Sequence, residues 1–425
     1  MVRRALTGLF VTGLLVGFVA CSGGDPSAAG LGDAGAAGDA NPADAQPADT
    51  AAPQRDSGVD APFDAPALDG AGDATADAGV SPPAVRFIGR FDTTDPAGPK
   101  VAWPGAQIVA RFSGTEVKAT LADAPNEYQP SHWDVTIDGT LAPTPLALTP
   151  ASKTYTLATG LTPGVHVVEL RKRTEAKAGV TQFFGFDYSG GVLLSPPPAR
   201  LRRIEFLGDS NANGYGIEGA GPGCSFTPAT QNEQKSFCAL TAAALQADHH
   251  NLAQSGIGVF LNYVRTDPNV MEVVYTRALP NTPGSTYDFT RFEPDVVWIT
   301  LGGNDWGGEN PDLPAPLTMA QFQAKYAQLV ALVRSKRPTA HLVCAVGASL
   351  SNDYPVGYNA YANVKTAIQN VVAARAAGGD TKIYAYEFAR AVTADKTACA
   401  YHFNAAKHAS LASETVAFLK SKTGW

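Results

Sequence analysis

Hydrophobic and polar residues alternate in short runs between residues 83 and 196. Such runs occupy residues 107–112, 133–137 and 166–170, and turn-forming pairs separate them at Asp138-Gly139 and Pro163-Gly164. A period of two places successive side chains on opposite faces of a strand, and closely spaced turns join neighbouring strands in antiparallel order. We therefore expect residues 83–196 to form an all-β sandwich domain.

The pattern changes between residues 195 and 198. Beyond this point short apolar runs read as buried strands, and they are separated by helical patterns in which apolar residues recur every three or four positions. Alternation of strands and helices is typical of a parallel sheet covered on both sides. We expect residues 197–425 to form an α/β domain with strands at 204–207, 296–301, 341–346 and 383–388, one helix with the apolar face Phe322, Tyr326, Leu329, Val330 and Val333, and another with Tyr361, Val364, Ile368, Val371 and Val372.

The segment from residue 21 to 82 consists almost entirely of Ala, Asp, Gly and Pro. Such a composition cannot bury enough apolar surface to offset the entropy of ordering the chain, so it predicts a disordered linker. Eleven Asp and one Arg lie in residues 22–82 and two Arg in residues 1–21, which leaves about +1 of the total charge of -7 for residues 83–425. A nearly neutral folded part argues against nucleic acid as a partner.

The first twenty residues resemble an export signal. Arg3 and Arg4 precede an apolar run from residue 9 to 20 that is too short to span a bilayer. The run ends in Phe18-Val19-Ala20-Cys21, which is similar to the cleavage site of bacterial lipoproteins, where the Cys is acylated. We expect residues 1–20 to be a lipoprotein signal peptide and Cys21 to anchor an exported chain at the bacterial cell surface or outer membrane; simple secretion is the alternative.

Polar side chains follow the predicted strands where each strand ends. They occur in Gly208-Asp209-Ser210, in Asn251 to Gly256, in Gly303-Asn304-Asp305, and at His402 before the last helix. Each group alone is ordinary turn or capping chemistry. Because active sites of parallel sheets lie at the carboxyl ends of the strands, their joint occurrence predicts one site.

These four groups resemble the signature blocks of the SGNH hydrolases. Three blocks farther upstream resemble carbohydrate esterase family 2, so the resemblance extends over about residues 84–425. They are Gly89-Arg90-Phe91-Asp92, Trp103-Pro104-Gly105, and residues 170–176 with the sequence Leu-Arg-Lys-Arg-Thr-Glu-Ala.

The resemblance implies a jelly-roll β-sandwich before an SGNH domain, and removal of acetyl groups from plant polysaccharides such as xylan and glucomannan, without a cofactor. Ser210 would attack the acetyl carbonyl, and His402 would take its proton as the general base. By the same analogy, the backbone N–H groups of Ser210 and Gly256 and the amide of Asn304 would form the oxyanion hole. The alternative is a membrane-tethered carbohydrate-binding lipoprotein whose catalytic site has decayed.

The alternative is motivated by departures from the family pattern around His402. Phe403 stands where a Pro is usual, Ala400 where many members have Asp, and Cys399 where SGNH hydrolases at large have Asp. Some members of the family it resembles use a main-chain carbonyl in place of a carboxylate, and by this resemblance we expect a main-chain carbonyl to orient the imidazole.

Two acidic residues outside the family positions are less favoured as partners of the imidazole. They are Asp395 and Glu387, whose predicted places lie away from the histidine turn.

Four cysteines remain in the predicted folded part, and in an exported protein they are expected to be bonded. Three connectivities are possible. We favour Cys224 with Cys238, which closes a local loop, and Cys344 with Cys399, which would fix the histidine turn to the sheet.

Other polar and aromatic residues yield weaker hypotheses. The run Asp248-His249-His250 has no third or fourth ligand at suitable spacing, so no metal site is expected. His408 is expected to face solvent or to pack in the last helix. Trp306 and Tyr215, with the neighbouring Asp305, could line a sugar-binding rim, although ordinary packing is an equal alternative for the aromatic rings. We expect a monomer.

Overall fold

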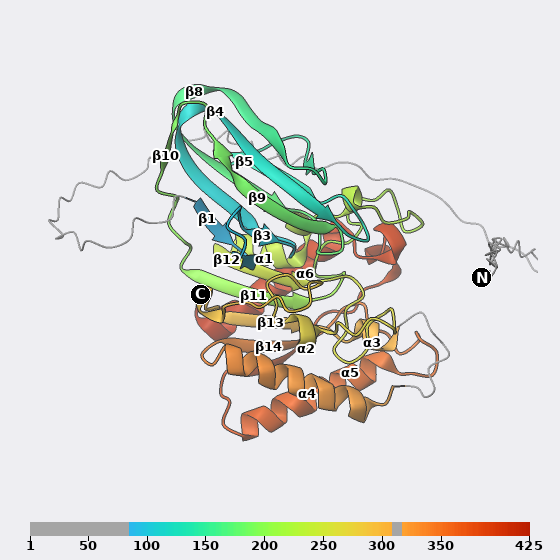
Figure 1. The fold of residues 1–425 in the computed structure, drawn as a ribbon. Coiled ribbons are helices and arrows are strands. Elements are labelled where there is room, and N and C mark those ends of the chain that lie inside the picture. Colours follow the sequence, from blue (N-terminus) through green and yellow to red (C-terminus); the bar gives the residue numbers. More distant parts are fainter. Residues whose placement is uncertain (1–84, 308–316) are drawn as a thin grey trace, which may run out of the picture. The chain divides into compact units, whose positions relative to one another are not determined.

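The computed structural model describes residues 85–307 and 317–425, all within a compact unit formed by residues 77–425 (Figure 1). The predicted signal peptide (1–20), linker (21–82) and lipidated Cys21 lie outside the described residues. No helix in the described ranges is both long enough and apolar enough to cross a membrane.

The first part of this unit is an antiparallel β-sheet, as the period of two predicts. Its strands are ordered β2-β3-β9-β4-β8-β5-β6, while β1 and β10 pair with β4, and β7 pairs with β5. Ile108, Trp133, Leu170 and Phe183 are buried in its core. The strands are β1 (Val85–Ile88), β2 (Phe91–Asp92), β3 (Lys100–Val101), β4 (Gln107–Pro125), β5 (His132–Ile137), β6 (Thr140–Leu141), β7 (Leu146–Ala147), β8 (Lys153–Lys172), β9 (Gly179–Asp187) and β10 (Val192–Leu194).

The long strands β4 and β8 give this sheet its curvature. They pair along most of their length, with register shifts near Gly114 and Val117. On its other edge, β4 pairs first with β1 and β10 and then, farther along, with β9. Irregularities of this kind bend a strand and increase its twist. The predicted turn at Pro163-Gly164 is wrong, because both residues lie inside β8, where Gly164 pairs with Gly114. The turn at Asp138-Gly139 is present, with both residues at positive φ.

The second part is built on a parallel five-stranded sheet with the order β12-β11-β13-β14-β15. All four predicted strands belong to it, and β12 is an additional edge strand. The strands are β11 (Arg202–Gly208), β12 (Ala247–Ala253), β13 (Val296–Thr300), β14 (His341–Val346) and β15 (Ile383–Glu387).

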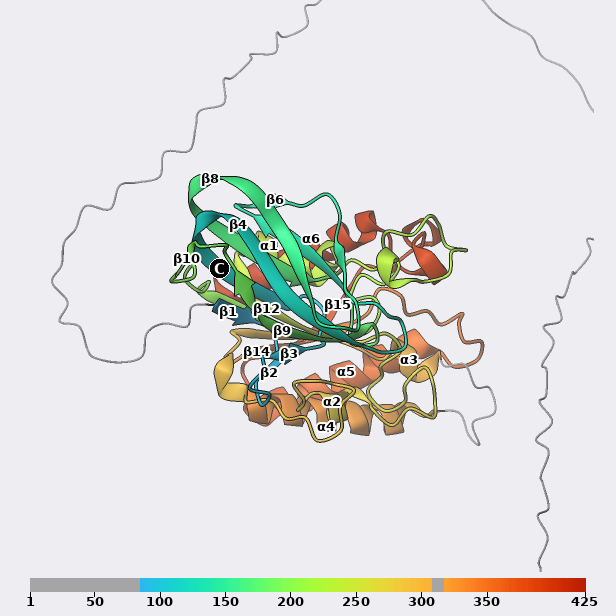
Figure 2. The ribbon, with the colours of Figure 1, turned by 45° about the horizontal axis from the view of Figure 1, so that its top comes forward.

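Helices cover both faces of the parallel sheet, as predicted. The buried faces of α4 and α5 pack with Leu207 and Val297 on one side, whereas α1 and α6 pack with Phe206 and Trp298 on the other. Figures 1 and 2 show α4 and α5 side by side on the side of the sheet away from the antiparallel strands. The helices are α1 (Phe237–Ala244), α2 (Met271–Val274), α3 (Gly303–Trp306), α4 (Met319–Lys336), α5 (Ala360–Ala377) and α6 (Ala405–Thr423).

A buried cluster of charges joins the two parts. Arg90, from the turn between β1 and β2, is fully buried and lies 3.1 Å from the carboxylate of Glu205 in β11, while Arg337 lies 2.9 Å from the same carboxylate. Burial opposes ionisation of Glu205, but the two guanidinium groups outweigh it and lower the pKa of Glu205 to about 2. The antiparallel part therefore supplies one of the two cations that keep the carboxylate of Glu205, in β11 of the second part, ionised.

Candidate active site

The nucleophile turn follows β11 directly. After Gly208 the chain turns through Asp209 and Ser210, and the Ala212 N–H donates to the Asp209 carbonyl at 2.9 Å. A Cβ atom on Gly208 would lie 2.3 Å from the Cβ of Ala212, so only glycine fits where the turn folds back onto the strand. The turn places Ser210 at the carboxyl end of the sheet.

His402 meets Ser210 from the turn that precedes α6. Its Nε2 lies 2.8 Å from the Ser210 Oγ. Its Nδ1 lies 3.2 Å from the Cys399 carbonyl oxygen and 3.1 Å from that of Ala400. Because a carbonyl oxygen only accepts, the proton of the neutral ring resides on Nδ1, which leaves Nε2 free to accept the proton of Ser210.

The electrostatics of His402 favour the neutral imidazole. Burial lowers the pKa of His402 below its ordinary value, and the hydrogen bonds to the Cys399 and Ala400 carbonyls oppose this only in part. A neutral ring is the form that can act as a base. The arrangement at Nδ1 is the one expected from the sequence, with main-chain carbonyls in place of a carboxylate.

Neither alternative carboxylate reaches His402 in the described part of the chain. Asp395 accepts the Val392 N–H at 2.9 Å and lies 4.0 Å from Lys407. Glu387 binds Lys365 at 2.7 Å and accepts from the Tyr361 hydroxyl.

The predicted disulfide pairs, Cys224 with Cys238 and Cys344 with Cys399, are wrong. Cys224 is bonded to Cys399, while Cys238 and Cys344 are free and buried. Cys344 belongs to the core on the α4 and α5 side of the sheet, and Cys238 to the core on the α1 and α6 side. Each therefore fills the core as a small apolar side chain, and neither can reach a loop cysteine.

Two glycines make room for this disulfide. A Cβ atom on Gly219 would lie 2.0 Å from the Cys399 Sγ, and one on Gly216 would lie 2.7 Å from the Cys399 Cβ. The Cys399 N–H donates to the Gly216 carbonyl at 3.2 Å, and the Ala400 N–H to the Cys224 carbonyl at 3.3 Å. The histidine turn is thus attached to the loop after Ser210 by a covalent bond and two hydrogen bonds.

A second turn, at residues 254–257, follows β12 and brings Gly256 to the same end of the sheet. The Ile257 N–H donates to the Gln254 carbonyl at 3.2 Å, and Gly256 has φ +81°, which favours glycine. The amide Nδ2 of Asn304 donates to the Ile257 carbonyl at 2.8 Å and lies 3.5 Å from the Asp209 carboxylate. Asn304 therefore joins this turn to the nucleophile turn.

Asp305 and Trp306 are both buried, so Trp306 follows the packing alternative and Asp305 is not at the surface that the sugar-rim hypothesis requires. The buried carboxylate of Asp305 accepts the N–H groups of Phe260 at 2.7 Å and Leu261 at 3.0 Å, so it holds the loop that follows Gly256. Trp306 is only 4% exposed and packs on Phe322. Both side chains point inward from the short helix α3, which follows the carboxyl end of β13. The two-glycine motif in the sequence does not reveal this orientation.

Tyr215 does lie beside the dyad. Its ring centroid is 4.4 Å from that of His402, and it stacks on Phe226 at 3.9 Å. Phe226 in turn contacts Tyr128, from the loop between β4 and β5, at 5.0 Å. Sequence reasoning missed Phe226 and Tyr128, because single aromatic residues in loops carry no periodic signal.

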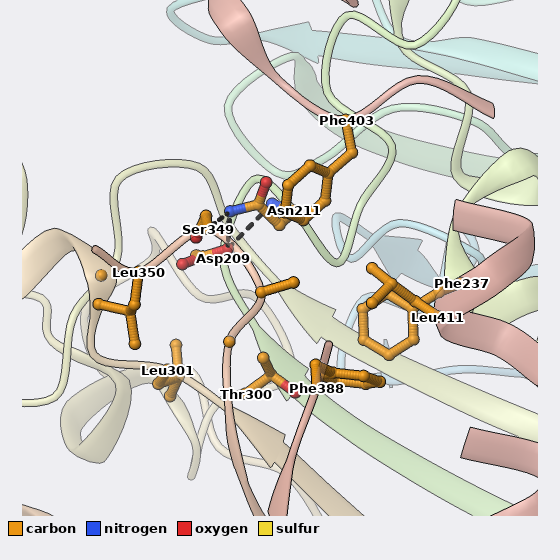
Figure 3. Close-up of a pocket in the computed structure, with 13 residues that line it drawn as sticks. Asp209, Asn211, Phe237, Thr300, Leu301, Ser349, Leu350, Phe388, Phe403 and Leu411 are labelled. Atoms are coloured by element: carbon orange, nitrogen blue, oxygen red, sulfur yellow. Dashed lines mark hydrogen bonds between the residues drawn. The ribbon is translucent and has the colours of Figure 1, made fainter. Parts of the chain in front are cut away.

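A small cavity of about 20 Å³ lies behind the nucleophile turn (Figure 3). Asp209, Asn211 and Ser349 form its polar part, and the Asn211 amide lies 3.3 Å from Asp209 and 3.5 Å from the Ser349 Oγ. Neither Ser210 nor His402 lines this cavity. Burial of Asp209 raises its pKa to about 6. The remaining lining residues are Phe237, Thr300, Leu301, Gly303, Gly347, Ala348, Leu350, Phe388, Phe403 and Leu411.

The residues of the Asp248-His249-His250 run have structural partners. Asp248 lies 3.7 Å from Arg86, and His249 lies 3.0 Å from Glu233. His250, on the opposite face of β12, stacks on Phe292 at 3.7 Å. In residues 85–307 and 317–425, no three His, Cys, Asp or Glu side chains are grouped as metal ligands.

His408 is packed, one of the two places expected for it. Its Nδ1 accepts the Phe237 N–H at 3.1 Å. Burial, with a smaller contribution from the charge of His402, lowers the pKa of His408 to about 3, so the ring stays neutral.

Comparisons with known proteins agree with this architecture. Residues 87–198 match the model of the carbohydrate esterase 2 N-terminal domain, and residues 206–409 match the GDSL-like lipase/acylhydrolase family. A solved family two carbohydrate esterase from Clostridium thermocellum, in complex with cellohexaose, is 34% identical, with a TM-score of 0.73 over 80% of this chain and 99% of that chain. The chain belongs to carbohydrate esterase family 2. It is therefore a member of a family of carboxylic ester hydrolases, with the jelly-roll sandwich and SGNH domain that the sequence predicts.

Two curated relatives are similar over about four fifths of this chain. A cellulase/esterase CelE from Acetivibrio thermocellus is 34% identical over 81% of this chain, and this chain spans 40% of its length. An acetylxylan esterase / glucomannan deacetylase from Cellvibrio japonicus is 27% identical over 80% of this chain and 90% of its own length.

Proposed function

We propose that this chain is a serine esterase that removes O-acetyl groups from plant polysaccharides, such as xylan and glucomannan, or from their oligosaccharides. The observation that carries the proposal is the contact of 2.8 Å between His402 Nε2 and Ser210 Oγ, in a ring whose Nδ1 faces two carbonyl oxygens. A hydroxyl beside an unprotonated imidazole nitrogen is the arrangement required for nucleophilic attack on an ester.

In the first half of the reaction, the Ser210 oxygen bonds to the acetyl carbonyl carbon while its proton passes to His402 Nε2. The carbonyl oxygen becomes an oxyanion, for which the N–H groups of Ser210 and Gly256 and the amide of Asn304 are the proposed donors. Collapse of this intermediate breaks the bond to the sugar oxygen, which takes the proton from His402. Water then attacks the acetyl-Ser210 ester by the same route and releases acetate.

Two observations support a carbohydrate as the alcohol part of the ester. Similar proteins are named for acetylxylan and glucomannan, or were solved with cellohexaose. In this chain Tyr215 and Phe226 form an aromatic stack beside His402, and aromatic faces suit the apolar faces of pyranose rings. Asp305 and Trp306 are excluded from this role by their burial.

The assembled dyad supports this reading over that of a decayed binding protein. A pure carbohydrate-binding surface has no need of a serine hydroxyl held at an unprotonated imidazole nitrogen. Hydrolysis of 4-nitrophenyl acetate and of acetylated xylan and glucomannan, each compared with the Ser210→Ala variant, tests the proposal. Turnover equal to that of Ser210→Ala on every ester would instead identify a binding protein.

We also propose that the chain is exported and lipid-anchored through Cys21, as the first twenty-one residues suggest. Metabolic labelling with a palmitate analogue should mark the wild-type protein and leave Cys21→Ser unmarked. An unlabelled wild-type protein in the culture medium would favour simple secretion.

A further inference from the structure

A closed ring of four hydrogen bonds connects the antiparallel part of the chain to both turns of the active site. The Glu175 N–H donates to the Gln231 Oε1 at 3.2 Å, and the Gln231 amide donates to the Asn213 carbonyl at 3.4 Å. The Asn213 amide donates to the Ser255 Oγ at 3.3 Å, and the Ser255 N–H donates to the Glu175 Oε2 at 2.5 Å. Asn213 lies three residues after Ser210, and Ser255 directly precedes Gly256.

The members of this ring are buried. Glu175, Gln231 and Asn213 are each 0% exposed, and Ser255 is 6% exposed. In such surroundings a hydrogen bond is not exchanged for one to water, and a donor left without its acceptor is costly. The ring therefore holds the two turns in one fixed relation.

Glu175 is the one member that comes from the antiparallel part of the chain. It follows the end of β8, where the buried ammonium group of Lys172 donates to the carbonyl oxygens of Thr174 at 2.8 Å and Glu175 at 3.3 Å. The backbone that carries the Glu175 side chain is therefore itself fixed. The carboxylate reaches across to the second part of the chain and accepts the Ser255 N–H.

The Ser255–Gly256 peptide carries the N–H that is proposed to bind the oxyanion. The Glu175 carboxylate holds the N–H of Ser255 before this peptide, and the Tyr263 N–H holds the Gly256 carbonyl after it at 2.7 Å. The direction of the Gly256 N–H is set between these two contacts. A donor in an oxyanion hole acts only if it points at the place where charge develops.

We propose that Glu175 is a positioning residue for the oxyanion hole, through which the β-sandwich part of the chain completes the active site. The proposal rests on the proposed esterase function. Glu175 touches neither Ser210 nor His402, so it acts through the turn and not on the reacting atoms. Its role is to keep the Gly256 N–H aimed while the tetrahedral intermediate forms and collapses.

The decisive variants change the carboxylate and keep the fold. Glu175→Gln retains an oxygen acceptor at the same distance from the backbone, Glu175→Asp withdraws it by one methylene group, and Glu175→Leu removes it. We expect Glu175→Gln to keep kcat within about threefold on 4-nitrophenyl acetate, and the Asp and Leu variants to lose roughly 10- to 100-fold in kcat with KM changed less than about threefold.

A second readout concerns the tetrahedral state alone. Methylboronic acid forms a tetrahedral adduct with an active serine, so its inhibition constant should rise in Glu175→Asp in proportion to the loss in kcat. Arg171→Met is the matched control, because Arg171 lies in β8 and donates to Gln234 in the second part at 3.0 Å, yet contacts neither turn. It should leave kcat and boronate inhibition unchanged.

The outcomes separate this inference from the proposed function. Wild-type kcat in a folded Glu175→Asp variant, or an equal loss in Arg171→Met, would overturn the role of Glu175. An inactive wild-type enzyme that does not bind the boronate would overturn the esterase proposal itself. If Glu175→Leu fails to fold, circular dichroism will show it. The comparison of kcat between Glu175→Asp and Glu175→Gln then tests the role of Glu175.

Discussion

Cys399 accepts the imidazole Nδ1–H of His402 through its carbonyl oxygen, at 3.2 Å, while its sulfur is bonded to Cys224. The next two residues, Ala400 and Tyr401, have φ of 52° and 58°. The left-handed region costs a non-glycine residue about 1–2 kcal/mol, so this turn persists only where its surroundings hold it. The disulfide is the covalent part of that support.

The first prediction is that loss of the disulfide impairs catalysis more than binding. The double variant Cys224→Ser/Cys399→Ser should lower kcat by roughly tenfold or more, because small displacements of a catalytic group are costly, with KM changed only a few-fold. Steady-state kinetics on 4-nitrophenyl acetate measures both constants. Cys344→Ala, which removes a free core cysteine, is the control and should keep kcat. Unchanged kcat in the double variant would mean that the hydrogen bonds alone hold the turn.

The second prediction concerns the dyad. Ser210→Ala and His402→Ala should each lower kcat by on the order of 10³ or more, and the double variant should be little worse than either, because the two side chains act as one unit. The measurement is kcat on 4-nitrophenyl acetate with all variants purified identically. Losses that multiply in the double variant would show that the two residues act independently.

The third prediction is that no carboxylate completes a triad. Asp395→Ala and Glu387→Ala should change kcat/KM by no more than about fivefold, since removal of a true triad carboxylate costs on the order of 10⁴. Profiles of kcat/KM between pH 5 and 9 for both variants and wild type provide the check. A loss of several hundred-fold in either variant would contradict the dyad.

The fourth prediction gives the acid limit of activity. Burial lowers the pKa of His402, so the ring remains neutral and basic at pH values below its ordinary pKa. The half-maximum of kcat/KM on the acid side should therefore fall below about pH 6.5, the ordinary value for histidine. The wild-type Asp209 carboxyl also titrates in this pH range. The acid limb of the kcat/KM profile should nevertheless keep its midpoint in the Asp209→Asn variant. A midpoint at pH 7 or above would contradict the prediction.

The fifth prediction concerns stability against pH. Burial raises the pKa of Asp209 from 3.8 to about 6. Between these two pH values, the folded state keeps a proton on Asp209 that the unfolded chain has released. The stabilisation from this group is present below pH 4 and is lost as the pH rises through 6, by an amount on the order of 3 kcal/mol.

Asp209→Asn should therefore gain stability relative to wild type as the pH rises from 4 to 7. The Asn side-chain oxygen can still accept the Asn211 N–H, which now lies 2.9 Å from the carboxylate. Urea unfolding of both proteins at four pH values measures the difference. A difference that stays constant with pH would show that Asp209 has an ordinary pKa.

The elements that the sequence predicts well are those with an apolar period. Phe322, Tyr326 and Val333 mark the buried face of α4, and β11, β13, β14 and β15 are short apolar runs. The edge strand β12 has the sequence Ala-Asp-His-His-Asn-Leu-Ala, yet every residue in it is buried. Its polar groups are paired with Arg86, Glu233 and other partners distant in sequence, which no local pattern encodes.

The candidate site was predictable to the same degree and for the same reason. Ser210 follows a recognisable strand, His402 precedes a recognisable helix, and the missing carboxylate is visible in the sequence around His402. The disulfide partner of Cys399 depends on how the loop at residues 216–224 folds back. The inward orientation of Asp305 depends on the path of residues 259–261. Both are products of tertiary packing, which spacing along the chain does not determine.

The buried guanidinium of Arg90 constrains how this chain can be divided. A fragment that begins after residue 200 would keep Glu205 and Arg337 but lose the cation that lies 3.1 Å from that carboxylate. Deleting one partner of a buried charged group typically costs about 3–5 kcal/mol, a large share of the stability of a domain. We therefore expect the second part of the chain alone to be less stable than the two parts together, because Arg337 is then the one that remains of these two guanidinium groups at Glu205.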